Sequence, residues 1–259
     1  MRAAITKTEI EAEIASRFGS AFKPQEKRQG EFLSSGVSQI DSFTGGLPRG
    51  AITEIYGPAS SGRTSFMLSA MAHATGHEEV CALVDTNNTF DPHSAARAEV
   101  RFDRLLWIRC ANNLEHAFKA TDMLLQAGGF GLVMLDLGDV PAKSVKKIIT
   151  SWWYRFRRTL EATTTALVVI VEDSAVRSCA AVSLELHTEN YLWRSSSEVA
   201  RSSSPEFSVT KFNSSVTHLH PQSSRIAFPH ANRLQGLAFQ VECRRPLYLK
   251  REVGVVARS

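Results

Sequence analysis

A short glycine-containing turn constrains the fold of this chain more than any other feature of its sequence. Residues 57–65 read GPASSGRTS; the strand-like run AITEIY precedes them, and a helical pattern follows from Gly62. Glycine lets the backbone curl so that several N–H groups point inward, and the N-terminus of a following helix adds partial positive charge. These groups make a cradle for an anion, so the strand–turn–helix order is typical of a phosphate-binding loop.

The turn supplies most of the candidate nucleotide-binding residues. Thr64 occupies the position whose hydroxyl would reach Mg²⁺. Glycine-rich turns also exist for purely structural reasons, so the neighbouring sequence has to decide between the two interpretations. The candidates in the turn are Gly57, Pro58, Ala59, Ser60, Ser61, Gly62, Arg63, Thr64 and Ser65.

Strand-like and helical patterns alternate along the body of the chain. This alternation predicts an α/β fold, with a mostly parallel sheet flanked by helices. From Ala181 the pattern changes to shorter strands, AVSLEL and EFSVTKF, around a serine-rich loop, so a few antiparallel strands are expected near the C-terminus. Strands are expected at residues 51–56, 80–85, 105–110, 131–137 and 166–171, and helices at 62–75, 94–100, 114–127 and 143–160.

Three regions are expected along the sequence. Residues 1–30 form an N-terminal helix and a polar tether, residues 31–217 form the core, and residues 218–259 give no clear structural pattern. The longest apolar run, residues 166–171, is far shorter than the roughly 20 residues of a membrane helix. The N-terminus carries charges where a secretory signal would be apolar. We therefore expect a cytoplasmic protein without membrane contact, and a net charge of +4 permits association with the nucleoid without establishing it.

The residues before the turn, SGVSQIDSFTGGLPRGAITEIY, resemble the start of the ATPase core of bacterial RecA and its relatives. VDTNNTFDPHSAARAEV is similar to the second core strand and its helix, including Asp91, and GLVMLDL resembles the Walker B strand, with Asp136 at its end. The resemblance spans residues 9–213. It implies a RecA-like fold that binds ATP and Mg²⁺, with Asp91 and Asp136 joining the turn at the nucleotide and with Thr64 and Asp136 at the metal.

Three positions depart from the RecA pattern. Arg63 replaces the lysine that reaches the β- and γ-phosphates as a compact charge, and arginine is larger and forked. Asn87 stands where RecA has the glutamate that activates the attacking water, and an amide cannot accept that proton at neutral pH. Ser94 replaces the tyrosine that packs on adenine. No catalytic residue is therefore assigned, and hydrolysis is expected to be weak or absent.

The two loops that grip single-stranded DNA in RecA are short in this sequence. Only LGDVPA follows Asp136, and only EDSAVRSCA follows Val171. Strand exchange through the usual axial channel is therefore not expected.

A short RecA-like core with a degenerate ATP site resembles the ImuA family, and residues 104–137 are similar to both ImuA and the cell-division inhibitor SulA. The ImuA resemblance implies an accessory role in translesion synthesis and DNA repair during the SOS response to DNA damage. It implies two partners, an ImuB-like Y-family polymerase homologue and a mutagenic C-family polymerase. Two alternatives stay open: a SulA-like inhibitor, and a working DNA-dependent ATPase of recombinational repair that uses Asp85 or Glu172 as its base.

Two segments suggest further contacts. Residues 9–22 resemble the helix by which RecA subunits hold their neighbours, so RecA or a second copy of this chain is an expected partner; folding back onto its own core is the alternative. Residues 151–160, SWWYRFRRTL, combine aromatic and basic side chains, which suit weak, nonspecific DNA binding. An amphipathic helix with a solvated basic face is the favoured interpretation. The candidate DNA contacts are Lys143, Lys146, Lys147, Arg155, Arg157 and Arg158.

Overall fold

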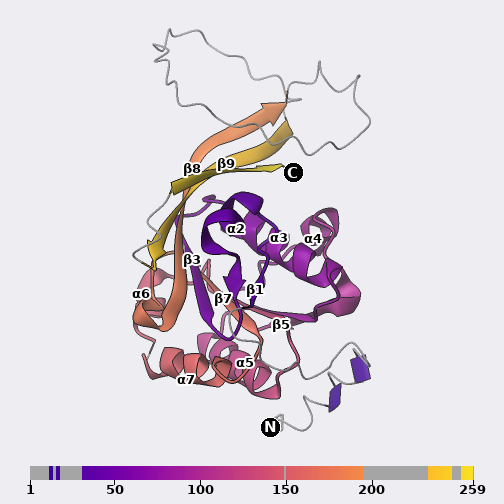
Figure 1. Cartoon of the computed structure of the whole chain (residues 1–259), viewed down its shortest axis with the longest axis vertical. Helices are drawn as coiled ribbons and strands as arrows, with labels where there is room; N and C mark the ends of the chain where they lie inside the picture. The colour runs from indigo at the N-terminus through magenta and orange to yellow at the C-terminus, as the bar shows by residue number, and fades with distance from the viewer. Residues whose placement is uncertain are drawn as a thin grey trace.

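The computed structural model describes residues 12–13, 16–17, 31–148, 150–194, 233–246 and 252–258. Eight strands form one sheet in the order β10-β9-β8-β3-β7-β6-β4-β5 (Figure 1). The six strands from β8 to β5 run parallel to one another, whereas β9 is antiparallel to β8 and to β10. The strands are β3 (Ile52–Tyr56), β4 (Cys81–Asp85), β5 (Leu105–Arg109), β6 (Leu132–Asp136), β7 (Ala166–Val171), β8 (Ala180–Arg194), β9 (Arg233–Arg245) and β10 (Glu252–Arg258).

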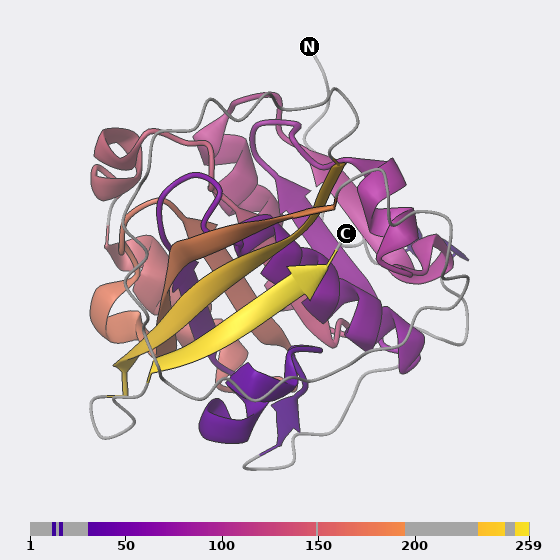
Figure 2. The same ribbon diagram turned by 90° about the horizontal axis from the view of Figure 1, so that it is seen from above.

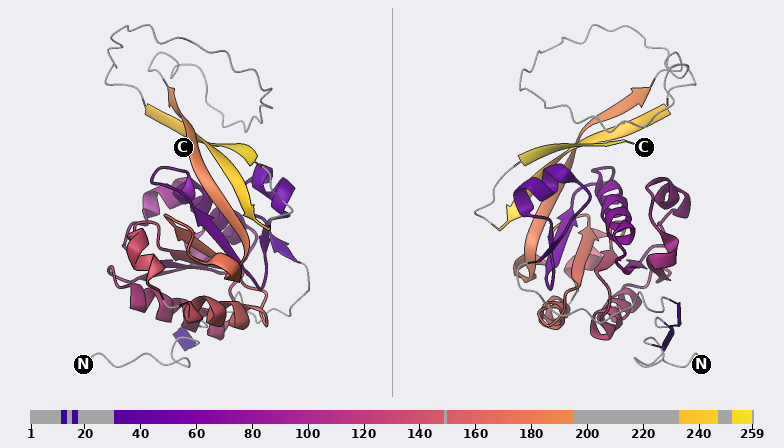
Figure 3. Two further views of the ribbon diagram at one scale, coloured as in Figure 1. Left: turned by 90° about the vertical axis from the view of Figure 1, so that its left-hand side faces the viewer. Right: turned by 45° about the vertical axis from the view of Figure 1, so that its right-hand side comes forward.

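Helices cover both faces of this sheet, as the alternation predicted (Figure 3). The helices α2, α3 and α4 pack on one face, and α5, α6 and α7 pack on the other. A small antiparallel ribbon of β1 (Phe32–Leu33) and β2 (Leu47–Pro48) lies on the α3 side. The bounds are α2 (Ser38–Thr44), α3 (Arg63–Gly76), α4 (Pro92–Arg97), α5 (Leu114–Ala127), α6 (Ala142–Lys146) and α7 (Ser151–Leu160), with short 3₁₀ turns at Phe102–Arg104 and Arg177–Cys179.

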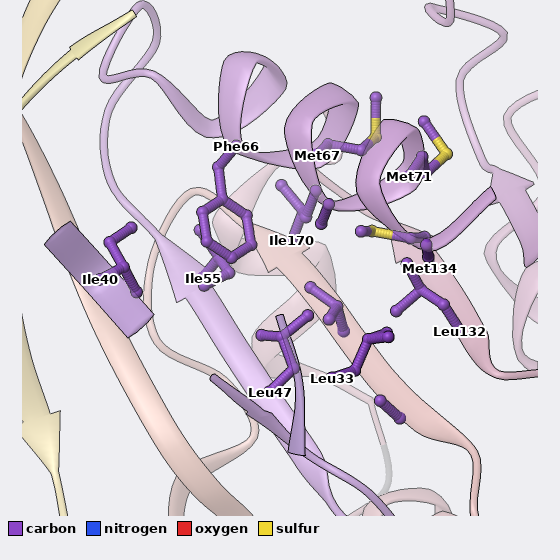
Figure 4. Packing of buried hydrophobic residues seen from close by; sticks show 14 of the residues in the cluster. Leu33, Ile40, Leu47, Ile55, Phe66, Met67, Met71, Leu132, Met134 and Ile170 are labelled. Atoms are coloured by element: carbon purple, nitrogen blue, oxygen red, sulfur yellow. The ribbon is translucent and has the colours of Figure 1, made fainter. Parts of the chain in front are cut away.

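The helix that follows the glycine-containing turn is fixed by apolar packing. Phe66, Met67 and Met71 of α3 are buried in one cluster with Ile55 and Ile170 of the strands, and Phe66 points towards Ile55 (Figure 4). Burying such side chains stabilises the fold by about 1.5–3 kcal/mol each. The N-terminus of α3, and with it the turn, is therefore held in a fixed position above the sheet.

The opposite face has its own aromatic cluster. Phe118 of α5 lies 5.0 Å from Trp153 and 5.5 Å from Phe156 of α7, measured between ring centroids. Leu160 is buried in the same cluster. These contacts confirm that α7 is amphipathic, with its aromatic residues mostly in the core.

The prediction of one helix over residues 143–160 was wrong, because the chain forms two helices, α6 and α7, instead. Residues 148–151 read Ile-Ile-Thr-Ser. β-Branched side chains and serine have low helix propensity, which favours a break at this point. The break lets Val145 and Trp153 both enter the core although they lie on separate helices.

The C-terminal part of the chain extends the sheet. The segment 218–259 gave no clear pattern from sequence, yet β9 within it lies alongside β8, and β10 lies alongside β9 (Figure 2). AVSLEL is the start of β8, whereas EFSVTKF lies outside the described residues. Of the N-terminal helix only residues 12–13 and 16–17 are described, and they are helical. In the described part of the chain, no helix has the length and apolar character that a membrane span needs.

A buried carboxylate joins the middle strand to the connection between β7 and β8. Glu54 of β3 is fully buried, and its Oε1 accepts the N–H groups of Ala175 at 2.6 Å and Val176 at 2.8 Å. Its Oε2 accepts the hydroxyls of Ser174 at 2.9 Å and Ser183 at 2.8 Å. Four donors thus replace the water that this charge loses on burial, as a buried carboxylate requires.

We predict that Glu54→Gln lowers the free energy of unfolding by about 2–4 kcal/mol, because the new amide turns an NH₂ group towards donors that need an acceptor. Urea unfolding followed by circular dichroism measures the change. The control is Glu115→Gln, which removes an exposed pair with Lys119 and should cost no more than about 0.5 kcal/mol. Equal stability losses in the two variants would contradict the role of Glu54.

Candidate nucleotide-binding site

Four loops meet at one edge of the sheet. They follow β3, β4, β6 and β7, which are mutually parallel, so their carboxyl ends lie at the same edge. Ligands of open α/β sheets bind at this edge. The structure therefore brings the turn, Asn87, Asp136 and Glu172 to one side of the molecule.

The turn has the geometry of an anion cradle. Ser60 has φ 62° and Gly62 has φ 98°, both in the left-handed region, so the backbone reverses and leads into α3. The N–H groups from Gly62 to Ser65 have no backbone acceptor in the described part of the chain. Unpaired N–H groups at the start of a 14-residue helix favour an anionic oxygen. The residues present therefore fit the phosphates of a nucleotide.

The β8–β9 pair holds the turn from outside. Thr188 of β8 donates its hydroxyl to the carbonyl oxygen of Ser60 at 2.7 Å. A Cβ atom on Gly62 would lie 2.7 Å from the ring of Phe239, so glycine is required here for close approach as well as for its φ. Neither Thr188 nor Phe239 was predicted to lie at the turn. Both belong to strands far along the sequence, and the pattern after residue 217 was too weak to predict β9.

Arg63 points across the edge of the sheet. Its side chain is buried, with the residue 9% exposed, and Nη1 donates to the carbonyl oxygen of Gly138 at 3.1 Å. Gly138 follows β6, and β7 lies between β6 and β3 in the sheet. The guanidinium therefore reaches over the end of β7 to the loop that follows Asp136.

Asp136 lies at the end of β6, where its Oδ1 accepts the N–H of Gly138 at 2.9 Å. Burial raises the pKa of this carboxyl group from 3.8 to about 6, and the charges of Asp85 and Asp139 add to the rise. The Gly138 hydrogen bond and the Arg63 charge lower the pKa and offset part of this effect. Asp136 and Arg63 are thus close enough to influence each other.

Asn87 is tied to a neighbouring loop. Its Nδ2 donates to Oδ1 of Asn112 at 3.0 Å, and its own Oδ1 is buried without a donor in the described residues. The hydroxyl of Thr86, the preceding residue, is buried without a partner in the same part of the structure. The amide of Asn87 is therefore held in place by the loop after β5. Asn112 was missed from sequence because it follows β5, in a turn with left-handed φ values at Ala111 and Asn112.

The two carboxylates considered as substitute bases differ in their surroundings. Asp85 is fully buried and accepts N–H groups from Thr89 at 3.0 Å, Phe90 at 3.2 Å and the Trp107 ring at 3.1 Å. Both of its oxygens are committed to the loop after β4, which argues against a role as a base. Glu172 is exposed, and its carbonyl oxygen accepts the N–H of Gly57 at 3.1 Å.

Asp91 and Ser94 lie at the start of α4. Oδ2 of Asp91 accepts both the N–H of Ser94 at 3.0 Å and its hydroxyl at 2.6 Å, and Oδ1 accepts the N–H of His93 at 3.1 Å. These bonds lower the pKa of Asp91. The carboxylate thus caps a helix, and a nucleotide role for it remains a prediction.

Half of the candidate DNA contacts are engaged in ion pairs. Lys146 pairs with Asp173 at 2.8 Å, Arg157 pairs with Glu161 at 3.2 Å, and Arg155 donates to the largely buried Asp122. The other three, Lys143, Lys147 and Arg158, are exposed and have no carboxylate partner within the described residues. Lys143 and Lys147 belong to α6 and its C-terminal end, whereas Arg158 lies on α7.

The raised pKa of Asp136 predicts how stability depends on pH. Between pH 4 and 6 the folded protein keeps a proton that the unfolded chain has released, so the wild type loses stability as pH rises through this window. The Asp136→Asn variant has no carboxyl group at this position, so it does not lose stability in this way as pH rises. The free energy of unfolding of the variant, relative to the wild type, should therefore rise by about 1–3 kcal/mol from pH 4 to 7. Denaturant titrations at several pH values measure it, and a stability difference that does not change with pH would contradict the prediction.

Comparisons with known proteins find relatives that carry the name Protein RecA. Protein RecA of Psychrobacter arcticus is 41% identical over 108 residues, which make up 41% of this chain and 30% of that protein. Protein RecA of Cutibacterium acnes is 41% identical over 92 residues, or 36% of this chain and 26% of that protein. Protein RecA of Acinetobacter baumannii is 38% identical over 108 residues, or 41% and 31%. The aligned part spans less than a third of each relative.

A family match covers a longer part of the chain. Residues 4–149 match the family described as RecA N-terminal domain. This range is more than half of the 259 residues, and it includes β3, the turn, Arg63 and Asp136. The chain therefore belongs to the RecA N-terminal domain family.

Proposed function

We propose that this protein is an ImuA-like accessory factor of DNA-damage-induced mutagenesis, which binds the phosphates of a nucleotide with little or no hydrolysis. Asn87 carries the proposal. Its amide occupies the position of the RecA glutamate and is bound to Asn112. A side chain without a basic group cannot take the proton of an attacking water.

Phosphate binding is supported separately from hydrolysis. The N–H groups from Gly62 to Ser65 need no general base to hold an anion, because they act through their dipoles and the helix N-terminus. A site that holds a nucleotide without hydrolysing it suits an accessory protein whose partners distinguish its nucleotide-bound form from its free form.

A protein partner is favoured over a DNA strand held in the middle of the molecule. The connection between β7 and β8 spans only residues 172–179, and Glu54 fixes its backbone at Ala175 and Val176. A short, clamped connection is a poor match for a mobile DNA-gripping loop. The partners we propose are an ImuB-like Y-family polymerase homologue and a mutagenic C-family polymerase, with RecA or a second copy at the N-terminal helix.

The second candidate is a working DNA-dependent ATPase of the RecA superfamily. The open cradle and the retained Asp136 favour it, because both are needed for turnover. Exposed Glu172 is then the remaining base, since Asp85 is buried and fully hydrogen-bonded. Turnover measurements separate the two candidates.

We predict that the purified protein shows little or no ATPase activity, with or without single-stranded DNA. Asn87→Glu restores a carboxylate at this position and should raise turnover, since a positioned general base contributes about 10²–10⁴-fold. The matched control is Asn88→Glu, which adds the same charge at the exposed neighbouring residue. RecA-like turnover by the wild type that is lost in Thr64→Ala would refute the proposal and support the second candidate.

We also predict that any DNA binding is electrostatic. Replacing Lys143, Lys147 and Arg158 together by glutamine should lower affinity and reduce the slope of log K against log salt by about 2, because each phosphate neutralised on a single strand adds roughly 0.7 to that slope. Fluorescence anisotropy over a range of NaCl concentrations measures it. The control is the triple glutamine variant of Lys146, Arg155 and Arg157, whose charges are paired. Salt-insensitive or ATP-dependent binding would count against this prediction.

A further inference from the structure

The charge of Arg63 and the carboxylate of Asp136 border the same small space. A Cβ atom placed on Gly138 would lie 3.0 Å from Oδ1 of Asp136 and 3.4 Å from Nη1 of Arg63. Gly138 also joins the two groups chemically, because its N–H donates to Asp136 and its carbonyl oxygen accepts from Arg63. The guanidinium is thus anchored beside the residue that would hold a metal ion.

This arrangement is a poor fit for magnesium. Mg²⁺ requires near-octahedral oxygen ligands at 2.0–2.1 Å and usually keeps several waters. Thr64 and Asp136 are the side chains that would bind it, yet a buried, permanently charged guanidinium lies beside Asp136. A hydrated divalent cation there would be repelled by Arg63 and would compete with the N–H of Gly138 for Oδ1 of Asp136.

The same arrangement is a good fit for an anion. Arginine has five N–H donors, and within the described residues only Nη1 of Arg63 is committed, to Gly138. The forked guanidinium can hold two phosphate oxygens at once. The main-chain cradle starts at Gly62, one residue before Arg63, so both can act on one phosphate chain.

We propose that Arg63 takes the place of the magnesium ion as well as of the usual lysine, so that this site binds the polyphosphate of a nucleotide without a divalent cation. The inference rests on the proposed nucleotide binding and adds its metal requirement. The chain supplies the neutralising charge, and Gly138 and Asp136 position it.

Isothermal titration calorimetry with ADP, in buffer with either EDTA or excess MgCl₂, tests the inference. The wild type should bind ADP in both buffers with affinities that agree within about threefold, whereas Arg63→Lys should bind about tenfold more tightly with MgCl₂ than with EDTA, since a single lysine leaves room and charge for the ion. Arg101→Lys makes the same exchange at an exposed residue that pairs with Asp103, and it should behave as the wild type. Circular dichroism confirms that each variant is folded.

The outcomes test the role of Arg63 and nucleotide binding separately. Wild-type binding that disappears in EDTA overturns the role of Arg63 and leaves nucleotide binding intact. Absence of ADP binding in both buffers overturns nucleotide binding itself, and the inference fails with it. The wild-type comparison decides between these results even if Arg63→Lys fails to fold.

Discussion

The carboxylate of Glu54 organises the structure around the site. Glu54 lies on β3, the strand that leads into the turn, and it binds both the connection after β7 and Ser183 on β8. A buried charge tolerates little displacement of its donors, because each broken hydrogen bond leaves charge unsolvated. The relative positions of β3, β7 and β8 are therefore fixed at the edge where the loops meet. Rigid support of this kind is what a preformed cradle needs.

Much of the fold followed from the sequence, for clear reasons. Strands β3 to β7 are mostly apolar runs of five or six residues, and their bounds agree with the prediction within two residues. The turn was predicted because its glycines let the backbone curl between a strand and a helix, which leaves a visible pattern in the sequence. The break between α6 and α7 was missed, because the helical periodicity continues across it and only local propensity opposes it. β9 was missed because the hydrophobic pattern in this part of the chain is weak.

The site was less predictable than the fold. The resemblance to RecA implied that Arg63, Asn87 and Asp136 belong to one nucleotide site, but it gave no direction for the side chains. The path of Arg63 depends on a carbonyl group at Gly138, and the environment of Asn87 depends on Asn112 in a loop after another strand. Such contacts join residues 25 to 75 positions apart. They depend on loop backbone geometry, which hydrophobic patterning does not encode.

The contacts of the β8–β9 pair with the turn connect the candidate site to the antiparallel strands of the sheet. Thr188 holds the carbonyl group of Ser60, and Phe239 faces Gly62. These two turn residues have left-handed backbones, so a change of conformation on filling the cradle would shift both contacts together. Anion binding in the cradle and movement of the β8–β9 pair would then be coupled. By thermodynamic reciprocity, a partner that binds these strands would change the affinity of the turn for the anion.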